Sequence, residues 1–112
     1  MPGKPRTHDW IDERSLALHR AIAAHLRADP QRVVARAKAN LARWMRTAGP
    51  RARPVLREWS EILESQTPDA LARLLTARDE RTRRLRQSSP FAGVLSSAER
   101  DAVFREYESL LA

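Results

Sequence analysis

The sequence contains no cysteine, only three glycines, and no long run of apolar residues. Without cysteine, the chain can form neither a disulfide framework nor a cysteine-based metal site. Its uncharged stretches are far shorter than the roughly 20 residues that a membrane-spanning helix needs, and Met1 to Pro5 lack the apolar stretch of a secretory signal. We therefore expect a soluble, bacterial-type cytoplasmic protein of one domain, because 112 residues allow a single modest core.

Basic residues outnumber acidic ones by 21 to 14, which gives a net charge of +7 at pH 7. The excess lies in the first half: residues 1–60 carry 13 basic and 5 acidic side chains, whereas residues 61–112 carry 8 and 9. Between Pro30 and Arg57 there are eight basic residues and no acid. This asymmetry favours a polyanion or an acidic protein surface as partner. Because 19 of the 21 basic residues are arginine, the composition of a GC-rich genome would explain it equally well.

Helical periodicity predicts an all-α fold, a small single-domain bundle of five or six short amphipathic helices. The predicted helices cover about residues 12–28, 30–47 and 54–65, with others beginning near residues 68 and 97. Asp29 and Thr67 each precede a proline, and Ser96 with Glu99 forms a capping box, so all three places are helix starts. Residues 1–11 are interpreted as a flexible lead-in, and residues 12–112 as the helical domain.

The helix that begins at Pro68 has two possible continuations. It either breaks and restarts near Thr76, where Asp79 would complete a weak capping box, or it continues to Gln87 with Arg78 turned toward a partner. We favour the break, because an unbroken helix would place Arg78 on the stripe of leucines that faces the core.

The segment from Pro30 to Thr47 has the clearest amphipathic pattern. At 100° per residue, one face gathers its apolar side chains, and the other gathers arginines. The apolar face consists of Val34, Ala37, Leu41, Met45 and Ala48, with Trp44 beside them. The arginines are Arg32, Arg36 and Arg43, with Arg46 at the border, and they are the candidate nucleic-acid contacts because they could follow a phosphate backbone.

Few residues suggest catalysis or metal binding. His19 and His25 lie about 120° apart around one helix and are expected to be partly buried helix residues rather than ligands. The sequence has no phosphate-binding glycine loop and no H-E-x-x-H pair, and Ser88 and Ser89 have no adjacent base. We expect no enzymatic activity, no cofactor, no metal and no small-molecule substrate.

The segment from Leu85 to Leu95 is unusual for a connection between helices. It places Phe91, Val94 and Leu95 around a turn formed by Pro90 and Gly93, whereas surface loops are normally polar. Such a loop either folds back onto the core or presents an apolar surface to a partner.

Five segments resemble one group of proteins: Leu18–Ala23, Ala39–Trp44, Arg57–Leu63, Arg84–Leu95 and Glu99–Arg100, of which Ser88–Gly93 is the most specific. The group consists of small helical bacterial proteins encoded beside nucleotidyltransferase-like proteins, in pairs similar to toxin–antitoxin modules of the AbiE type. The resemblance implies an antitoxin that binds and suppresses its cognate toxin, and it leaves contact with promoter DNA open.

The leading hypothesis is therefore an antitoxin that binds through Arg84 to Leu95 and the helix that follows. The candidate partner contacts are Arg84, Arg86, Ser88, Ser89, Pro90, Phe91, Gly93, Val94 and Leu95. Phe91 is the predicted anchor, Gly93 the turn residue with unusual backbone angles, and the two arginines clamps on toxin carboxylates. The alternative hypothesis is a DNA-binding regulator that uses the arginines of residues 30–47.

Overall fold

Six helices and no strand make up residues 7–111, the part of the chain that the computed structural model describes. They are α1 (Thr7–Ala28), α2 (Pro30–Met45), α3 (Arg53–Ser65), α4 (Pro68–Leu75), α5 (Glu80–Arg86) and α6 (Ser97–Leu111). This composition confirms the predicted all-α fold.

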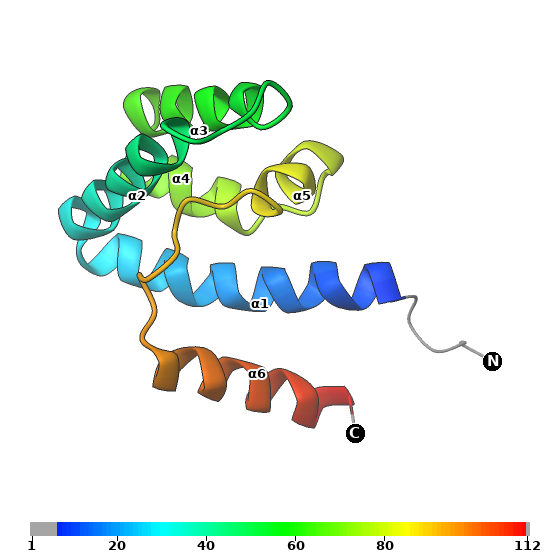
Figure 1. The fold of residues 1–112 in the computed structure, drawn as a ribbon. Helices are drawn as coiled ribbons and strands as arrows, with labels where there is room; N and C mark the ends of the chain where they lie inside the picture. The colour runs from blue at the N-terminus through cyan, green and yellow to red at the C-terminus, as the bar shows by residue number, and fades with distance from the viewer. Residues whose placement is uncertain (1–6, 112) are drawn as a thin grey trace.

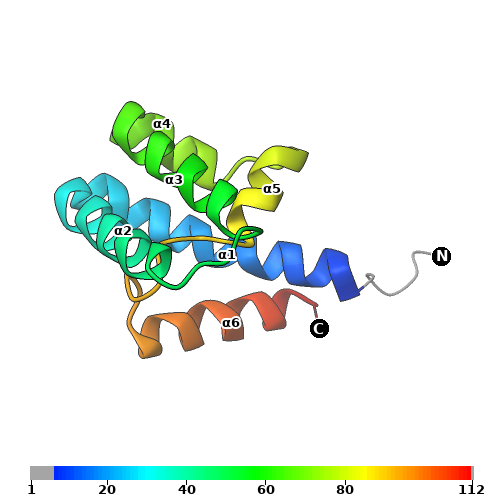
Figure 2. The same ribbon diagram turned by 45° about the horizontal axis from the view of Figure 1, so that its top comes forward.

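The long helix α1 runs through the middle of the molecule. Figure 1 shows α2 to α5 on one side of α1 and α6 on the other, antiparallel to α1. Figure 2, a view turned by 45°, shows the same separation of α6 from the other helices. The molecule therefore has one thick layer, formed by α1 to α5, and one thin layer, formed by α6 alone.

The predicted helix starts are confirmed by hydrogen bonds to the capping side chains. Asp29 accepts from the backbone of Arg32 at 3.3 Å, and Thr67 accepts from the backbone of Ala70 at 3.1 Å. The capping box before α6 is complete, since Ser96 and Glu99 each accept a hydrogen bond from the other's backbone N–H at 3.1 Å. These local interactions satisfy backbone donors that the helices themselves leave unpaired.

Two predicted boundaries are wrong. α1 begins at Thr7, five residues before the predicted start at Asp12, so Trp10 is helical and only residues 1–6 of the expected lead-in lie outside the described residues. The predicted break after α4 is confirmed, but the chain becomes helical again at Glu80 rather than near Thr76. Asp79 is itself the cap of α5, since it accepts a hydrogen bond from the backbone of Thr82 at 2.8 Å.

The early start of α1 brings Trp10 beside Arg14, which also contacts α6. The Arg14 guanidinium lies 3.7 Å from the ring centre of Phe104 on α6 and 5.2 Å from that of Trp10 on α1. Such cation–π contacts stabilise the first turns of α1 against α6. The sequence of residues 1–11 alone gives no sign of this neighbour.

The core lies between α1 and the helices above it, with Trp59 at its centre. The Trp59 side chain is fully buried and meets the edge of Phe91, with 5.7 Å between the ring centres and 84° between the ring planes. The other large buried side chains come from every helix except α6 and from the loop after α5: Leu16, Ile22, Leu26, Val33, Leu41, Leu56, Ile62, Leu63, Leu71, Leu75, Leu85, Val94 and Leu95.

The buried face of α2 differs from the predicted one. Val33 and Asn40 are buried with Ala37 and Leu41, whereas Val34, Trp44, Met45 and Ala48 are only partly buried. α2 packs against α1 and α3, and the loop after α5 also lies on it, which turns the covered face toward Asn40. Periodicity missed Asn40 because its amide is polar.

Candidate functional site

The loop of residues 87–96, which we call the closing loop, folds back onto the core. Phe91, Val94 and Leu95 are 2, 4 and 6 % exposed, and Pro90 is also buried. Of the two positions expected for this segment, folded back onto the core or exposed to a partner, the structure shows the first. Phe91, the predicted anchor for a partner, is not available at the surface of this structure, because its ring packs in the core against Trp59.

Helix α2 holds the closing loop through one buried amide. Asn40 donates hydrogen bonds to the carbonyl oxygens of Pro90 and Ala92 at 2.8 and 2.9 Å. Arg43 donates to the Asn40 side-chain oxygen at 2.9 Å, and Arg36 donates to the carbonyl of Ala92 at 3.3 Å. Two of the four arginines predicted to contact nucleic acid thus stabilise the loop.

The remaining two arginines of that prediction lie at opposite ends of α2. Arg32 pairs with Asp29 at 3.5 Å and donates to the ring of His25 at 3.2 Å. Arg46 is exposed at the C-cap. All four side chains are exposed, and Arg32, Arg36 and Arg43 also form hydrogen bonds within the molecule.

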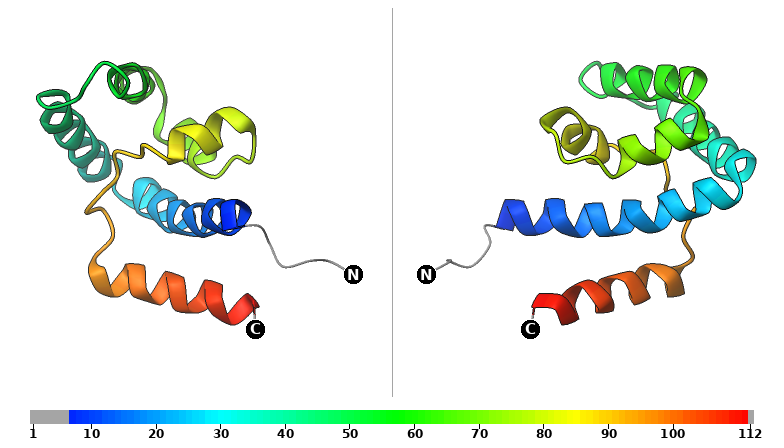
Figure 3. Two further views of the ribbon diagram at one scale, coloured as in Figure 1. Left: turned by 45° about the vertical axis from the view of Figure 1, so that its right-hand side comes forward. Right: turned by 180° about the vertical axis from the view of Figure 1, so that it is seen from behind.

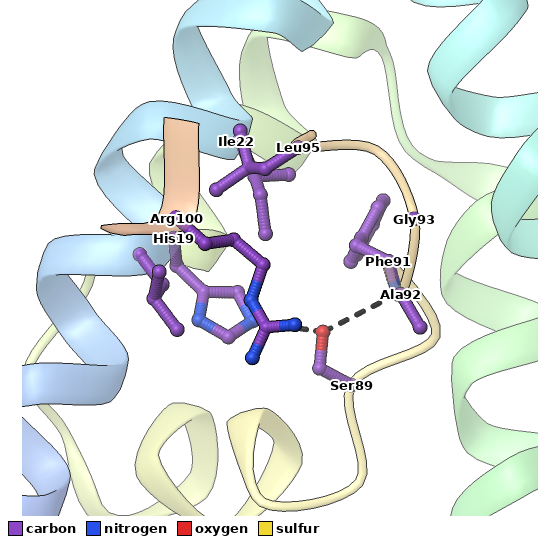
Figure 4. A pocket seen from close by; sticks show the side chains of 9 residues that line it. His19, Ile22, Ser89, Phe91, Ala92, Gly93, Leu95 and Arg100 are labelled. Carbon is purple, nitrogen blue, oxygen red and sulfur yellow. Dashed lines mark hydrogen bonds between the residues drawn. The ribbon is translucent and has the colours of Figure 1, made fainter. Parts of the chain in front are cut away.

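Helix α1 holds the closing loop through His19, which Figure 4 shows beside Ser89. Nδ1 of His19 donates to the carbonyl of Ser15 at 2.7 Å, because a carbonyl can only accept. In the neutral ring Nε2 is then an acceptor, and the Ser89 hydroxyl donates to it at 2.8 Å. Burial lowers the pKa of His19 to about 4, and the positive charge of Arg86 adds to this effect.

A pocket of about 250 Å³ opens beside His19 and Ser89. Figure 4 shows Arg100 at its edge and the closing loop along one side, and the remaining walls are the apolar side chains of Leu18, Ile22, Phe91 and Leu95. A serine hydrogen-bonded to a histidine is also the arrangement of a nucleophile and its base. A ring with a pKa of about 4 is a weak base at neutral pH, however, so this hydrogen bond favours a structural role for His19.

The predicted partner contacts next to the closing loop have different surroundings. Gly93 has the expected unusual backbone angles, with a φ of +83°. Arg86 is 7 % exposed and donates to the carbonyls of Leu75 and Ala77 at 3.3 and 2.6 Å, so it caps the end of α4 and is not a clamp on a partner. Arg84 is exposed and pairs with Glu58 at 3.0 Å. Arg84 is exposed and Ser88 and Ser89 are partly exposed, so these three residues are still candidate partner contacts.

The α1–α6 groove is a second hollow, of about 350 Å³, between the two helices. Ala17 and Ala21 of α1 face Val103, Tyr107 and Leu110 of α6 across it, and Arg20 and Glu106 also line it. The sequence pattern places Val103, Tyr107 and Leu110 on one line of α6, but it does not show that the line stays open. Leu110 is 79 % exposed, and Val103 and Tyr107 are half-buried.

Helix α6 packs against α1, and two side-chain interactions join the two helices. Nε2 of His25 lies 2.5 Å from a carboxylate oxygen of Glu99, and the Arg14 guanidinium covers Phe104. The hydrogen bonds from Ser96 and His25 lower the pKa of Glu99, so its carboxylate is charged at neutral pH. These interactions join α6 to α1 at its first turn and midway along its length, although none of the described α6 side chains belongs to the buried core.

Comparisons with protein families, with curated proteins and with solved structures find no match to this chain. Among the side chains of residues 10–110, which are the ones the structure describes, no histidines and carboxylates gather in a group of three or more that could bind a metal ion. No helix within residues 7–111 is both long and apolar enough to cross a membrane.

Proposed function

We propose that this protein is a non-enzymatic antitoxin that binds a nucleotidyltransferase-like toxin with α6 and the facing side of α1. The observation that carries the proposal is the α1–α6 groove, where Val103, Tyr107 and Leu110 present apolar surface. Exposed apolar patches with a polar rim are typical of protein interfaces, and Arg20 and Glu106 supply such a rim.

The charge of α6 complements the expected partner. α6 contains four acidic residues, Glu99, Asp101, Glu106 and Glu108, and two basic ones, Arg100 and Arg105. The rest of the chain is strongly basic, and a toxin that acts on RNA needs a basic surface of its own. Two basic proteins meet most favourably where one of them is acidic, and α6 is that part of this chain.

The proposed toxin contact therefore lies on α6 and α1, and not on the closing loop that the sequence suggested. A partner could reach Phe91 only if the closing loop left the core, which would break the Asn40 hydrogen bonds to Pro90 and Ala92 and expose Trp59. No such rearrangement is needed at the α1–α6 groove, where Leu110 is already 79 % exposed.

The test is co-expression of the open reading frame adjacent to this gene, with and without this protein, followed by co-purification. The proposal predicts growth arrest by the adjacent product alone, and rescue through a stable complex. Leu110→Ser should weaken the purified complex about tenfold or more, since a few central apolar contacts dominate most interfaces. Glu106→Arg should also weaken it, because the change puts a positive charge on the acidic helix that faces a basic partner. Ala42→Ser, an exposed site on α2, is the matched control and should have no effect. Absence of both toxicity and a complex would refute the proposal.

A further inference from the structure

Helices α4 and α5 form a unit whose dimensions are those of a helix-turn-helix. α4 covers Pro68–Leu75, four residues follow, and α5 covers Glu80–Arg86. The motif needs a short helix, a turn of three or four residues and a second helix at a steep angle. In the right-hand view of Figure 3, α4 lies across the picture while α5 is seen nearly end-on, so the two helices cross steeply. By contrast, α1 and α2 are joined by Asp29 alone, and α2 and α3 by residues 46–52.

The inner face of α5 is fixed rigidly to its neighbours. The Thr82 hydroxyl donates to the carbonyl of Ala77 at 3.0 Å, and the Arg86 guanidinium donates to the same carbonyl at 2.6 Å. From the other side, the Trp59 indole donates to the carbonyl of Leu85 at 3.0 Å. Ala72 of α4 is fully buried. These contacts set the direction in which the outer face of α5 points.

The outer face of α5 consists of long polar side chains only. Glu80, Arg81 and Arg84 of α5 and Gln87, the C-cap that follows it, are exposed at spacings that place them on one side of the helix. Their guanidinium, carboxylate and amide groups are the ones that recognise base edges in the major groove. Glu58 of α3 accepts hydrogen bonds from Arg81 at 3.3 Å and from Arg84 at 3.0 Å, and so it orients both arginines.

A strongly basic segment lies beside the end of α5. Thr47, Ala48 and Ala52 of the α2–α3 connection share a hollow with Gln87 and Ser88. This connection and the first turns of α3 carry the exposed arginines Arg46, Arg51, Arg53 and Arg57. Because no acidic residue occurs between Pro30 and Arg57, these arginines are suited to phosphate groups.

We propose that α5 enters the major groove of duplex DNA, where Arg81, Arg84 and Gln87 read base edges while the arginines of the α2–α3 connection contact the phosphates. Duplex DNA is favoured over an acidic protein because base-reading and phosphate-binding groups lie side by side in the same surface. It is favoured over double-stranded RNA, because the major groove of RNA is too narrow for a helix. The proposal does not depend on the toxin partner, since α5 and α6 lie on opposite sides of α1 (Figure 1).

The ion pairs of Arg81 and Arg84 with Glu58 do not prevent these arginines from contacting DNA. Their side chains are 55 and 52 % exposed, and ion pairs at such positions contribute little to stability, so a base edge can replace the carboxylate. Glu58 also repels phosphate. Glu58→Gln should therefore tighten binding to duplex DNA by about threefold or more, whereas a surface that does not contact DNA would show no gain.

The experiment is selection of duplexes from a library with a randomised 20-base-pair centre by the full chain, followed by fluorescence anisotropy on the selected duplex and on a scrambled one. Arg84→Ala should weaken binding to the selected duplex roughly tenfold and abolish its preference at one base position. Arg51→Ala should weaken binding to both duplexes alike. It should also reduce the slope of the logarithm of the binding constant against the logarithm of the salt concentration by about 1. Arg105→Ala, an exposed arginine on α6, is the matched control.

Three results would overturn the proposal. The first is that no duplex binds more tightly than about 10 µM at 0.1 M salt, a level typical of non-specific contact. The second is that Arg105→Ala weakens binding as much as Arg84→Ala does, which would indicate only a general effect of charge. The third is that a single-stranded RNA of equal length displaces the selected duplex, which would make RNA the ligand.

Discussion

Replacement of Phe91 by alanine separates a core role of the closing loop from a role in partner binding. The ring is 2 % exposed and meets the edge of Trp59, so its removal leaves a cavity in the core. Truncation of a buried phenylalanine typically costs about 3–5 kcal/mol, of which the aromatic contact accounts for roughly 1 kcal/mol. Because a domain of this size is stable by only about 5–15 kcal/mol, Phe91→Ala should lose a large share of that stability.

The assay is urea unfolding followed by tryptophan fluorescence, to which Trp59 contributes. With a denaturant slope of about 2 kcal/mol per molar urea, a loss of about 4 kcal/mol lowers the midpoint by about 2 M. Phe91→Leu keeps most of the volume and should lose about 1 kcal/mol, so it stays measurable if the alanine variant does not fold. Leu110→Ala, at an exposed site, should change the stability by less than about 0.5 kcal/mol. A loss below about 1 kcal/mol for Phe91→Ala would show that the closing loop is not part of the core.

Three further predictions concern the contacts around the closing loop. Burial lowers the pKa of His19 from 6.5 to about 4, so the folded state favours the neutral ring. The stabilisation from this group is complete above pH 6.5 and falls by about 3 kcal/mol as the pH drops to 4. In thermal melts, His19→Gln should therefore reduce the loss of stability at acidic pH. Gly93→Ala should cost about 1–2 kcal/mol in urea unfolding, since φ is +83° and the added methyl would meet the Arg36 guanidinium, whereas Gly49→Ala, where a methyl group meets nothing, should be nearly neutral. Arg86→Gln should cost about 1–3 kcal/mol, because the Leu75 carbonyl loses its side-chain donor and the Ala77 carbonyl keeps only the Thr82 hydroxyl, and an unchanged melting temperature would contradict its capping role.

The sequence predicts those features of the fold that depend on neighbouring residues. The caps at Asp29, Thr67 and Ser96 form as expected, because each needs only the backbone three residues further along. The break after α4 is also predictable, since a continuous helix would have turned Arg78 toward the core. The positive φ of Gly93 is also predictable from local sequence, because glycine is the residue that best fits such a turn.

The sequence does not predict features that depend on distant segments. Asn40 is recognisable as a core residue only when the carbonyls of Pro90 and Ala92 are known to lie opposite its amide. Arg86 looks like a surface charge until the end of α4 is placed beside it. The closing loop has two physically reasonable positions, and only its contacts with α1, α2 and α3 decide between them.

The most direct test of the proposed function is amide hydrogen exchange of this chain, alone and in complex with the product of the adjacent open reading frame. Exchange slows where a partner covers or orders the backbone. The proposed contact predicts new protection in α6 and in the part of α1 that lines the α1–α6 groove, with none added in residues 87–96. New protection confined to residues 87–96, or to α5, would contradict it.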